Sequence, residues 1–289
     1  KMEWLKKLGE AIDYLEAHLD KDLSYQEAAR IACCSPEYFQ RIFSYIAGVS
    51  LSEYIRRRKM TQAAFELQQT NSGVIDVAVK YGYSSPTSFN RAFQKVHGIK
   101  PMTAKNMGCT LCAYPALKFS VQVSGDTPIS YHTEEKDLIR IVGFKTPLVE
   151  NMEANMKHIP LFWKQAWSQN QIEKLAKLSD GNPDGILGVS IYSGPQNFYY
   201  YIAVSTDAPA LDNMAEYTIP KATWAVFENS GQFKEDVQSV YRRFLTEFLP
   251  LSGYVYAGLP DIEVYPFSTG QPASGQSQVW IAIKKAKEV

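Results

Sequence analysis

Residues 24–50 read SYQEAARIACCSPEYFQRIFSYIAGVS, and residues 71–101 read NSGVIDVAVKYGYSSPTSFNRAFQKVHGIKP. When the first stretch is shifted by fifty residues onto the second, seven positions are identical without a gap. An in-register internal repeat of this kind indicates that one supersecondary unit occurs twice. The identical pairs are Ala28 and Ala78, Ser35 and Ser85, Pro36 and Pro86, Phe39 and Phe89, Arg41 and Arg91, Phe43 and Phe93, and Gly48 and Gly98.

Each copy carries the signals of two short helices joined by a tight turn. In the first copy Ser24 can cap the first helix, and Glu27 completes a capping box. A Ser-Pro pair marks the start of each second helix, because proline lacks only an N–H that has no helical partner there. Phenylalanines four residues apart give each second helix a buried stripe, and a glycine ends it. The pattern predicts two helix-turn-helix motifs, whose second helices enter the DNA major groove.

Residues 51–69 connect the two copies and are predicted to form one long helix. Arg56 to Lys59 form a basic run on it. A rigid connecting helix fixes the separation of the two second helices, so one monomer can read two successive turns of major groove, about 34 Å apart. The apolar side of this helix is marked by Leu51, Tyr54, Ile55, Ala63 and Leu67.

Charge is distributed unevenly along a chain whose net charge is zero. Residues 1–106 hold 15 Lys and Arg against 11 Asp and Glu, whereas the remainder holds 15 against 19. This difference favours a polyanionic partner for the first part only. No segment approaches the roughly 18 apolar residues of a membrane span, and four cysteines are too few for a disulfide framework, so we expect a reduced, cytoplasmic location and no membrane partner.

Residues 2–106 resemble the DNA-binding domain of the AraC/XylS family of transcriptional regulators. The repeat carries this resemblance, together with MEWLKK at the start of the segment and GIKP near its end. In that family the domain usually lies at the C-terminus, so its position here resembles the Rob-like subgroup. The resemblance implies double-stranded DNA as a partner and RNA polymerase as a second one.

Side chains opposite the phenylalanine stripes are the candidates for DNA contact. Gln40 suits an adenine edge and Arg41 a guanine edge, and the resemblance points to the same positions. Alternatively, Arg41 and Arg91 only form salt bridges or lie in solvent, and the basic run is a solvated face; Arg57 is our candidate for phosphate contact within that run. The predicted DNA-binding residues are Glu37, Gln40, Arg41, Ser44 and Arg57, and in the second copy Thr87, Ser88, Asn90 and Arg91.

Four cysteines and four histidines give no complete metal or catalytic motif. Cys109 and Cys112 have C-x-x-C spacing, but no second pair or clustered histidine supplies further ligands. The simplest interpretation of Cys33 and Cys34 is that they are small buried residues. The chain also lacks the G-x-G-x-x-G, Walker and G-x-S-x-G motifs. We therefore expect no metal, no cofactor and no enzymatic activity.

Residues 107–116 are the predicted linker to a second domain over 117–289. Helices are expected over 153–178 and 233–249, between strands. Strand, helix and two strands then occur twice, which indicates an α+β domain of two similar halves around a groove. The predicted strands are ALKFSVQVS (116–124), DLIRIVGFKT (137–146), GILGVSIYSG (185–194), FYYYIAVST (198–206), ATWAVFENSG (222–231), DIEVYPFS (261–268) and VWIAIKKA (279–286).

Residues 117–287 resemble the GyrI-like effector-binding domain. WAVFENSG (224–231), LPLSGY (249–254) and PDIEVYPF (260–267) carry the resemblance. It implies an aromatic groove with an acid at its floor, which is Glu263 in this chain. A carboxylate inside such a groove is costly unless a cation or hydrogen-bond donors meet it, and aromatic faces attract cations. The candidate walls are Trp163, Trp167, Tyr192, Tyr200, Trp224 and Tyr256, although each could be an ordinary core aromatic and Glu263 could form a structural ion pair.

Two classes of function remain open at this point. In the first, the chain is a transcriptional regulator whose second domain binds a lipophilic or cationic small-molecule effector. In the second, the GyrI-like domain is a hydrolase of reactive electrophiles with Glu263 as general base, or it binds a protein partner. The DNA-binding domain in front of it favours the regulator.

Overall fold

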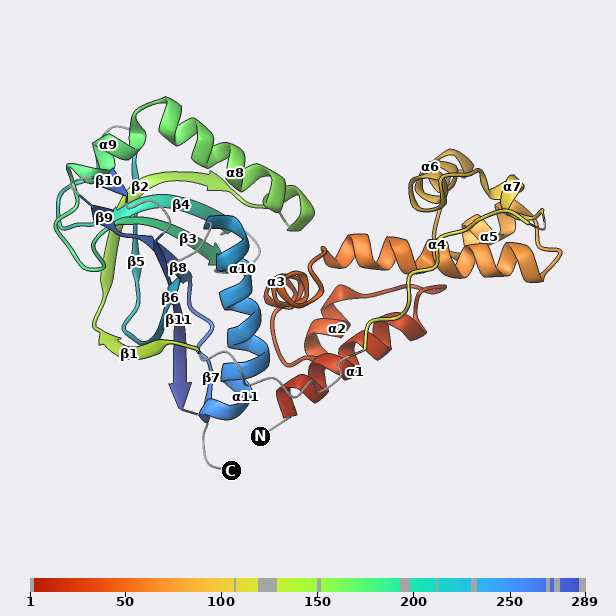
Figure 1. The fold of residues 1–289 in the computed structure, drawn as a ribbon, viewed down its shortest axis with the longest axis horizontal. Coiled ribbons are helices and arrows are strands. Elements are labelled where there is room, and N and C mark those ends of the chain that lie inside the picture. Colours follow the sequence, from red (N-terminus) through yellow and green to blue (C-terminus); the bar gives the residue numbers. More distant parts are fainter. Residues whose placement is uncertain are drawn as a thin grey trace. The chain divides into compact units, whose positions relative to one another are not determined.

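The computed structural model describes residues 3–106, 108–118, 129–149, 152–192, 198–211, 213–229, 233–268, 271–272 and 276–285. The chain forms two compact units, residues 2–121 and residues 122–289. The first is helical and the second is built around a β-sheet, as Figure 1 shows. The prediction of an all-α domain followed by an α+β domain is confirmed.

The first unit consists of helices in two similar groups on either side of one long helix. Ser35 caps α3 by accepting a hydrogen bond from the Tyr38 N–H at 3.2 Å, and glycines with positive φ end α3 and α6. Ser24 likewise caps α2, but the Glu27 carboxylate pairs with Arg30 rather than completing a capping box. The helices are α1 (Glu3–Ala17), α2 (Tyr25–Ile31), α3 (Pro36–Ala47), α4 (Leu51–Gln69), α5 (Val74–Lys80), α6 (Pro86–His97) and α7 (Pro101–Ala104).

Helix α4 is shared by the two groups. Its first half packs on α3, where the Phe43 and Tyr54 rings lie 5.1 Å apart. Its second half buries Met60 and Leu67 against the core formed by Phe89 and Phe93 of the second group. The apolar side predicted for residues 51–69 is buried as expected. The helix therefore holds both second helices in fixed positions within this unit.

Residues 108–118, which we call the strap, lie along the surface of the first unit and form hydrogen bonds with it. The Cys112 N–H donates to His97 Nδ1 at 3.3 Å, the Tyr114 N–H to Thr61 Oγ1 at 3.1 Å, and the Leu117 N–H to the Tyr54 hydroxyl at 3.0 Å. These contacts run from α6 along α4. The predicted linker thus begins as a segment attached to the DNA-binding unit.

The second unit contains one curved antiparallel sheet with the strand order β1-β6-β11-β8-β3-β4-β2-β5, with β7 paired to β11. Its strands are β1 (Tyr131–Lys136), β2 (Ile139–Pro147), β3 (Ile186–Tyr192), β4 (Phe198–Ser205), β5 (Ala215–Ile219), β6 (Ala222–Asn229), β7 (Tyr254–Tyr256), β8 (Asp261–Tyr265) and β11 (Ser277–Lys285). A separate short pair is formed by β9 (Phe267–Ser268) and β10 (Gln271–Pro272). Its helical segments are α8 (Met152–Ser168), α9 (Gln171–Ala176), α10 (Phe233–Arg243), a π-helical turn η1 (Phe244–Phe248) and α11 (Leu249–Ser252).

The sheet shows the predicted duplication. β2, helices α8 and α9, β3 and β4 form one half, and β6, helices α10 and α11, β8 and β11 form the other. The halves meet where β3 pairs with β8. The halves also exchange one strand each. β1 comes just before β2 of the first half in the chain but pairs with β6 of the second half. β5 comes just before β6 of the second half but pairs with β2 of the first half. The sequence did not predict these two exchanged strands.

Two details differ from the predicted elements. The helix expected over 153–178 is broken at Asn170, whose φ of 56° lies in the left-handed region, into α8 and α9. The strand expected over 116–124 lies mostly outside the described residues, and Ala116–Lys118 are not part of a strand.

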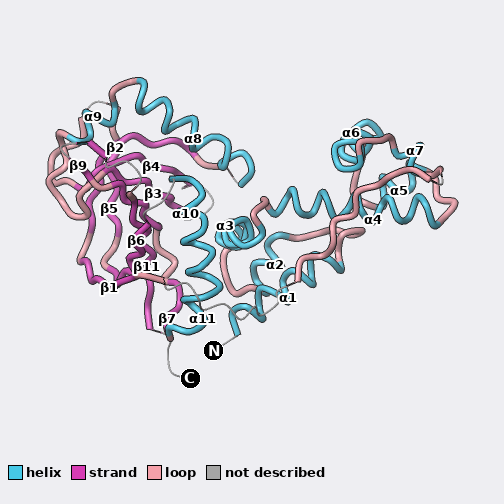
Figure 2. Tube along the Cα trace, viewed as in Figure 1, coloured by secondary structure: helices cyan, strands magenta, loops and turns pink. Residues whose placement is uncertain are grey.

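The two faces of the sheet have separate cores because successive strand residues point to opposite sides. One face packs against α8 and α9, with Tyr200, Ile202 and Tyr265 in this core. The other core contains Trp224, Ile262 and Trp280. Figure 2 shows the helices of this unit beside the strands of the sheet. Glu263, between Ile262 and Val264, lies on the face that the helices cover.

Candidate functional site

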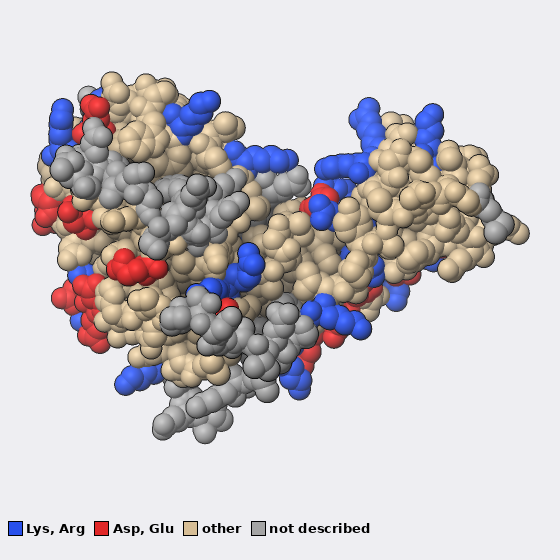
Figure 3. All heavy atoms as spheres, in the orientation of Figure 1, with Lys and Arg blue, Asp and Glu red and all other residues tan. Residues whose placement is uncertain are grey.

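The second helix of the second repeat presents its predicted DNA-binding side chains openly. Thr87, Ser88 and Arg91 on α6 are exposed and Asn90 is half-buried, while Phe89 and Phe93 on the other side are fully buried. The Ser88 hydroxyl donates to the Ser85 carbonyl at 2.7 Å. Figure 3 shows Lys and Arg side chains projecting over the region of α6. This helix has the separation of polar and apolar sides that major-groove contact requires.

The equivalent side of α3 is less accessible in this structure. Glu37 is half-exposed, but Gln40, Arg41 and Ser44 are buried. Arg41 Nε donates to the Tyr45 hydroxyl at 3.2 Å, and the Ser44 hydroxyl donates to the Arg41 carbonyl at 2.7 Å. DNA contact by the residues of α3 therefore stays a prediction.

The basic run on α4 is not a simple solvated face. Arg56 and Arg57 both form ion pairs with Glu53, and the Arg57 guanidinium lies 4.9 Å from the Tyr114 ring of the strap. Arg58 is buried and pairs with Glu16 of α1 at 2.7 Å. Arg58 thus joins α1 to α4. Arg57, which is partly exposed, remains our candidate for contact with a phosphate.

In the second unit, Glu263 lies in a chain of hydrogen bonds among aromatic side chains. The Tyr265 hydroxyl donates to Glu263 Oε2 at 2.6 Å, and the Tyr200 hydroxyl donates to the same oxygen at 3.4 Å. Trp163 Nε1 of α8 donates to the Tyr200 hydroxyl at 2.9 Å. The Trp163 and Tyr265 rings pack edge to face with centroids 5.2 Å apart. We call these four residues the Glu263 cluster.

The local sequence explains how the cluster can form. Gly188 of β3 stands opposite Glu263 in the strand pairing, and a Cβ there would clash with the Tyr200 hydroxyl. The glycine therefore makes the space through which Tyr200, on β4, approaches the carboxylate on β8. Burial, reinforced by the nearby Glu263 charge, raises the pKa of Tyr265 well above its usual value. The phenol thus stays protonated and donates to the carboxylate.

The structure brings only some of the predicted aromatic residues to Glu263. Trp163 and Tyr200 contact the cluster, but Trp224 lies on the opposite face, fully buried, with its ring 6.2 Å from that of Trp280. Trp224 is a core residue, and its prediction as a groove wall is corrected. The reason is strand register, since Trp224 pairs with Ala282, on the other face from Glu263.

Three further candidates are also separate from the cluster or undescribed. Tyr256 is aligned with Ile283, four residues along β11 from the partner of Glu263, and its hydroxyl donates to the Leu259 carbonyl. Trp167 is on α8 with 51% of its surface exposed. The Tyr192 side chain lies outside the described residues. Tyr265 was missed, although its position two residues after Glu263 places it on the same face of a strand.

The described part of the chain contains no group of three or more His, Cys, Asp or Glu residues that could hold a metal ion. The four cysteines are not joined in disulfides. No helix within the described ranges is long and apolar enough to cross a membrane.

Two family models match the chain, one in each unit. Residues 28–107 match a helix-turn-helix domain, and residues 133–283 match the model described as integron-associated effector binding protein. The order of the two matches agrees with the arrangement implied by the resemblance to the Rob-like subgroup.

Known relatives match parts of the chain. The HTH-type transcriptional activator AarP of Providencia stuartii is 40% identical over 94 residues, which cover 32% of this chain and 70% of AarP. The regulatory protein SoxS of Salmonella typhimurium is 34% identical over 84 residues, which cover 29% of this chain and 78% of SoxS. Among solved structures, SAV2435 bound to tetraphenylphosphonium is 22% identical and covers 54% of this chain and 94% of its own, with a TM-score of 0.48.

The helical unit and its relatives define an AraC-type, DNA-binding transcriptional regulator, and an effector-binding domain follows its DNA-binding domain. The family model that matches the second unit spans more than half of the chain. The chain belongs to the integron-associated effector binding protein family.

Proposed function

We propose that this regulator is controlled by a lipophilic organic cation that binds at the Glu263 cluster. The observation that carries the proposal is the contact of one carboxylate oxygen with the hydroxyls of Tyr200 and Tyr265, beside the Trp163 ring on the helix-covered face. A carboxylate among aromatic rings favours a cation with an apolar body, because the charge pairs with the acid and the body contacts the rings. The two phenols keep the acid satisfied until a ligand arrives.

The test compares two ligands and two matched acid-to-amide changes. Glu263→Gln keeps the shape of the side chain and one acceptor oxygen but removes its charge. We expect it to weaken binding of tetraphenylphosphonium about ten- to hundredfold, as loss of a charge-assisted contact does, and to change binding of neutral triphenylphosphine oxide little. Isothermal titration of the full chain gives both affinities.

Glu228→Gln is the matched control, because Glu228 is exposed on β6 and pairs only with Gln278 among the described residues. It should leave both affinities unchanged. Equal tetraphenylphosphonium affinity in the wild-type chain and Glu263→Gln would mean that Glu263 is a structural acid and would reject the proposed site.

For the first unit, we propose that α3 and α6 enter successive turns of the major groove. Gln40, Arg41, Asn90 and Arg91 would then reach base edges, with Glu37, Ser44, Thr87 and Ser88 beside them, and Arg57 would meet a phosphate. The repeat and the shared helix α4 support this arrangement.

The regulator would act in the cytoplasm and engage RNA polymerase at its target promoter, without catalysis at Glu263. Transcription in vitro from a bound promoter, with and without the cation, tests the control by a ligand. Turnover of an electrophilic ester by the purified chain, lost in Glu263→Gln, would instead favour a hydrolase.

A further inference from the structure

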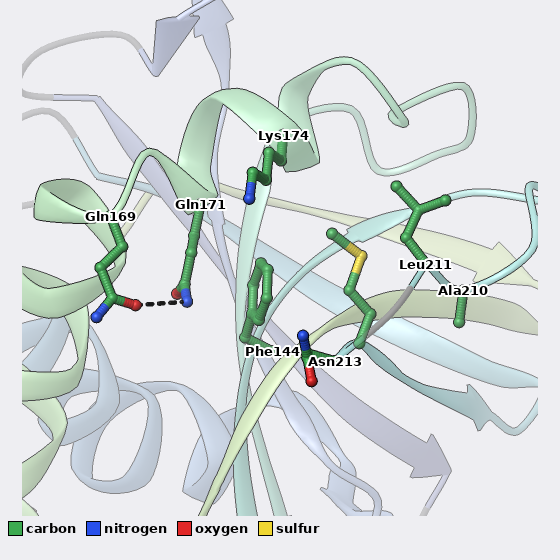
Figure 4. Close-up of a pocket in the computed structure, with 8 residues that line it drawn as sticks. Phe144, Gln169, Gln171, Lys174, Ala210, Leu211 and Asn213 are labelled. Carbon is green, nitrogen blue, oxygen red and sulfur yellow. Dashed lines mark hydrogen bonds between the residues drawn. The ribbon is translucent and has the colours of Figure 1, made fainter.

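A hollow of about 890 Å³ opens on the second unit, away from the Glu263 cluster. Its volume is within the range of small-molecule sites. Figure 4 shows Lys174 and Gln171 on one side, Leu211 and Ala210 on the other, and Phe144 between them. The lining residues are Phe144, Gln169, Gln171, Lys174, Ala210, Leu211, Asn213 and Met214.

Strand pairing separates the hollow from Glu263. Glu263 pairs with Gly188, Gly188 with Ile202, and Ile202 with Phe144. Three strand spacings amount to about 14 Å, and buried core residues fill the interval, Ile202 among them. None of the residues that line the hollow belongs to the Glu263 cluster.

Arg140 of β2 fixes the segment after β4 that leads into one wall of the hollow. Its guanidinium donates to the Thr206 carbonyl at 2.8 Å and to the Ala208 carbonyl at 2.7 Å. The Met214 N–H donates to the Leu211 carbonyl at 2.9 Å in the same wall. The opposite wall is the start of α9. A site whose neighbouring backbone is already held in place loses less entropy when a ligand binds.

The lining combines an apolar surface with one positive charge. Phe144, Leu211 and Met214 supply the apolar part, and Lys174 is the only charged residue among the lining side chains that the structure describes. Its ammonium has no ion pair or hydrogen bond with any described residue. Gln171 Oε1 is a buried acceptor that also lacks a partner within the described ranges. Amide groups of Gln169 and Asn213 complete the rim.

We propose that this hollow is a second ligand site, for a small organic anion with an apolar body such as an aromatic carboxylate. Lys174 pairs with the carboxylate, Gln169 and Asn213 offer amide donors beside it, and Phe144 with Met214 contacts the ring. The charge preference is opposite to that of the Glu263 cluster. The inference is independent of the proposed function, because it uses none of the residues of that cluster.

The test uses phenylacetate as the probe, with phenylacetamide as its neutral counterpart and phenethylamine as its cationic one. The chain contains 7 methionines, so methyl-labelled methionine gives a simple NMR spectrum, and Met214→Leu assigns the signal of Met214. We expect phenylacetate to shift the Met214 methyl signal at millimolar concentration, and phenethylamine to leave it in place. No shift with phenylacetate up to tens of millimolar, or an equal shift with the amine, would overturn the proposal.

Two pairs of variants locate the contacts. Lys174→Met removes the charge and should weaken phenylacetate binding about fivefold, the upper range for an exposed ion pair. Lys177→Met makes the same change at an exposed lysine just after α9 that does not line the hollow, and should have no effect. An unchanged affinity in Lys174→Met would also overturn the proposal.

Asn213→Gly removes the amide while keeping the backbone, since Asn213 has a φ of 67°, which glycine adopts freely. It should weaken phenylacetate binding by a smaller factor than Lys174→Met. Glu263→Gln should not change phenylacetate binding, so failure of the proposed cation site and failure of this anion site give different results.

Discussion

Gly188 lies where the Tyr200 hydroxyl reaches toward Glu263, and this close approach can be tested by a double-mutant cycle. A Cβ at residue 188 would clash with that hydroxyl and would lie 3.1 Å from Glu263 Oε2. We expect Gly188→Ala to lower the free energy of unfolding by about 1–3 kcal/mol, the usual effect of overpacking. In a Tyr200→Phe background the clashing oxygen is absent, so the same change should have a clearly smaller effect.

Urea denaturation followed by tryptophan fluorescence measures both effects. Four of the five tryptophans belong to the second unit. An equal loss of stability from Gly188→Ala in both backgrounds would show that the hydroxyl is not what the alanine methyl meets.

His97 provides a pH-dependent contact between α6, α4 and the strap. Its Nε2 lies 3.0 Å from the Met60 carbonyl and must donate to it, while Nδ1 accepts from the Cys112 N–H. Burial lowers the pKa of His97 from its ordinary value of about 6.5. Just below pH 6.5, His97 of the unfolded chain therefore binds more protons than His97 of the folded chain. The stability that neutral His97 contributes is thus complete above pH 6.5 and is lost as the pH falls toward the folded pKa.

We expect the free energy of unfolding of the first unit to decrease as the pH falls below about 6.5, with a smaller slope in His97→Gln. Helix content measured by circular dichroism during denaturation gives the slope. His132→Gln is the control, because His132 is exposed and belongs to the second unit. The same slope with and without His97 would contradict the assignment.

At the scale of a helix, the repeat offers two equivalent serines at N-cap positions, of which one forms a capping hydrogen bond. Ser35 accepts the Tyr38 N–H at the start of α3, whereas Ser85 makes no side-chain capping bond at the start of α6. Ser35→Ala should therefore cost about 1 kcal/mol, and Ser85→Ala only a few tenths. Thermal denaturation of the two single variants makes the comparison, and a larger loss at Ser85 would reverse it.

The sequence predicted helices and strands well where the signal lies within the element itself. The serine, proline and glycine signals gave α3 and α6, and alternation gave β2, β4 and β8. The cluster was predicted less well because it depends on pairing between strands. Trp224 and Trp163 look alike in sequence, and only the register of β6 against β11 shows that Trp224 belongs to the other core.

A charge run is ambiguous for a similar reason. Arg56, Arg57 and Arg58 are adjacent, yet Arg58 alone is buried against Glu16, a residue 42 positions earlier. Nothing local in the sequence distinguishes it from its neighbours. The strap was also unpredictable, because its backbone N–H groups meet side chains of α4 and α6 that only the tertiary structure brings beside it.

At the scale of the whole molecule, one DNA-binding unit with two second helices and one effector-binding domain share a single chain. Basic residues outnumber acidic ones in residues 1–106 and the reverse holds in the rest. The acidic excess of the second unit should discourage its own contact with phosphates. DNA affinity should then depend on the first unit, and strongly on salt, because each neutralised phosphate releases counterions.

Arg91 separates base recognition from phosphate contact in a single measurement. A duplex of about two helical turns, selected from a random pool by the full chain, would be titrated at several salt concentrations with wild-type protein and Arg91→Ala. If Arg91 reads a guanine, the variant should bind about 1–3 kcal/mol more weakly, lose preference at one base pair and keep the salt dependence. Lys80→Ala is the matched control, because Lys80 is an exposed cation that pairs with Glu66 at 2.8 Å on another helix. A uniform loss across sequences with a shallower salt dependence would assign Arg91 to a phosphate, and an unchanged affinity would remove α6 from the interface.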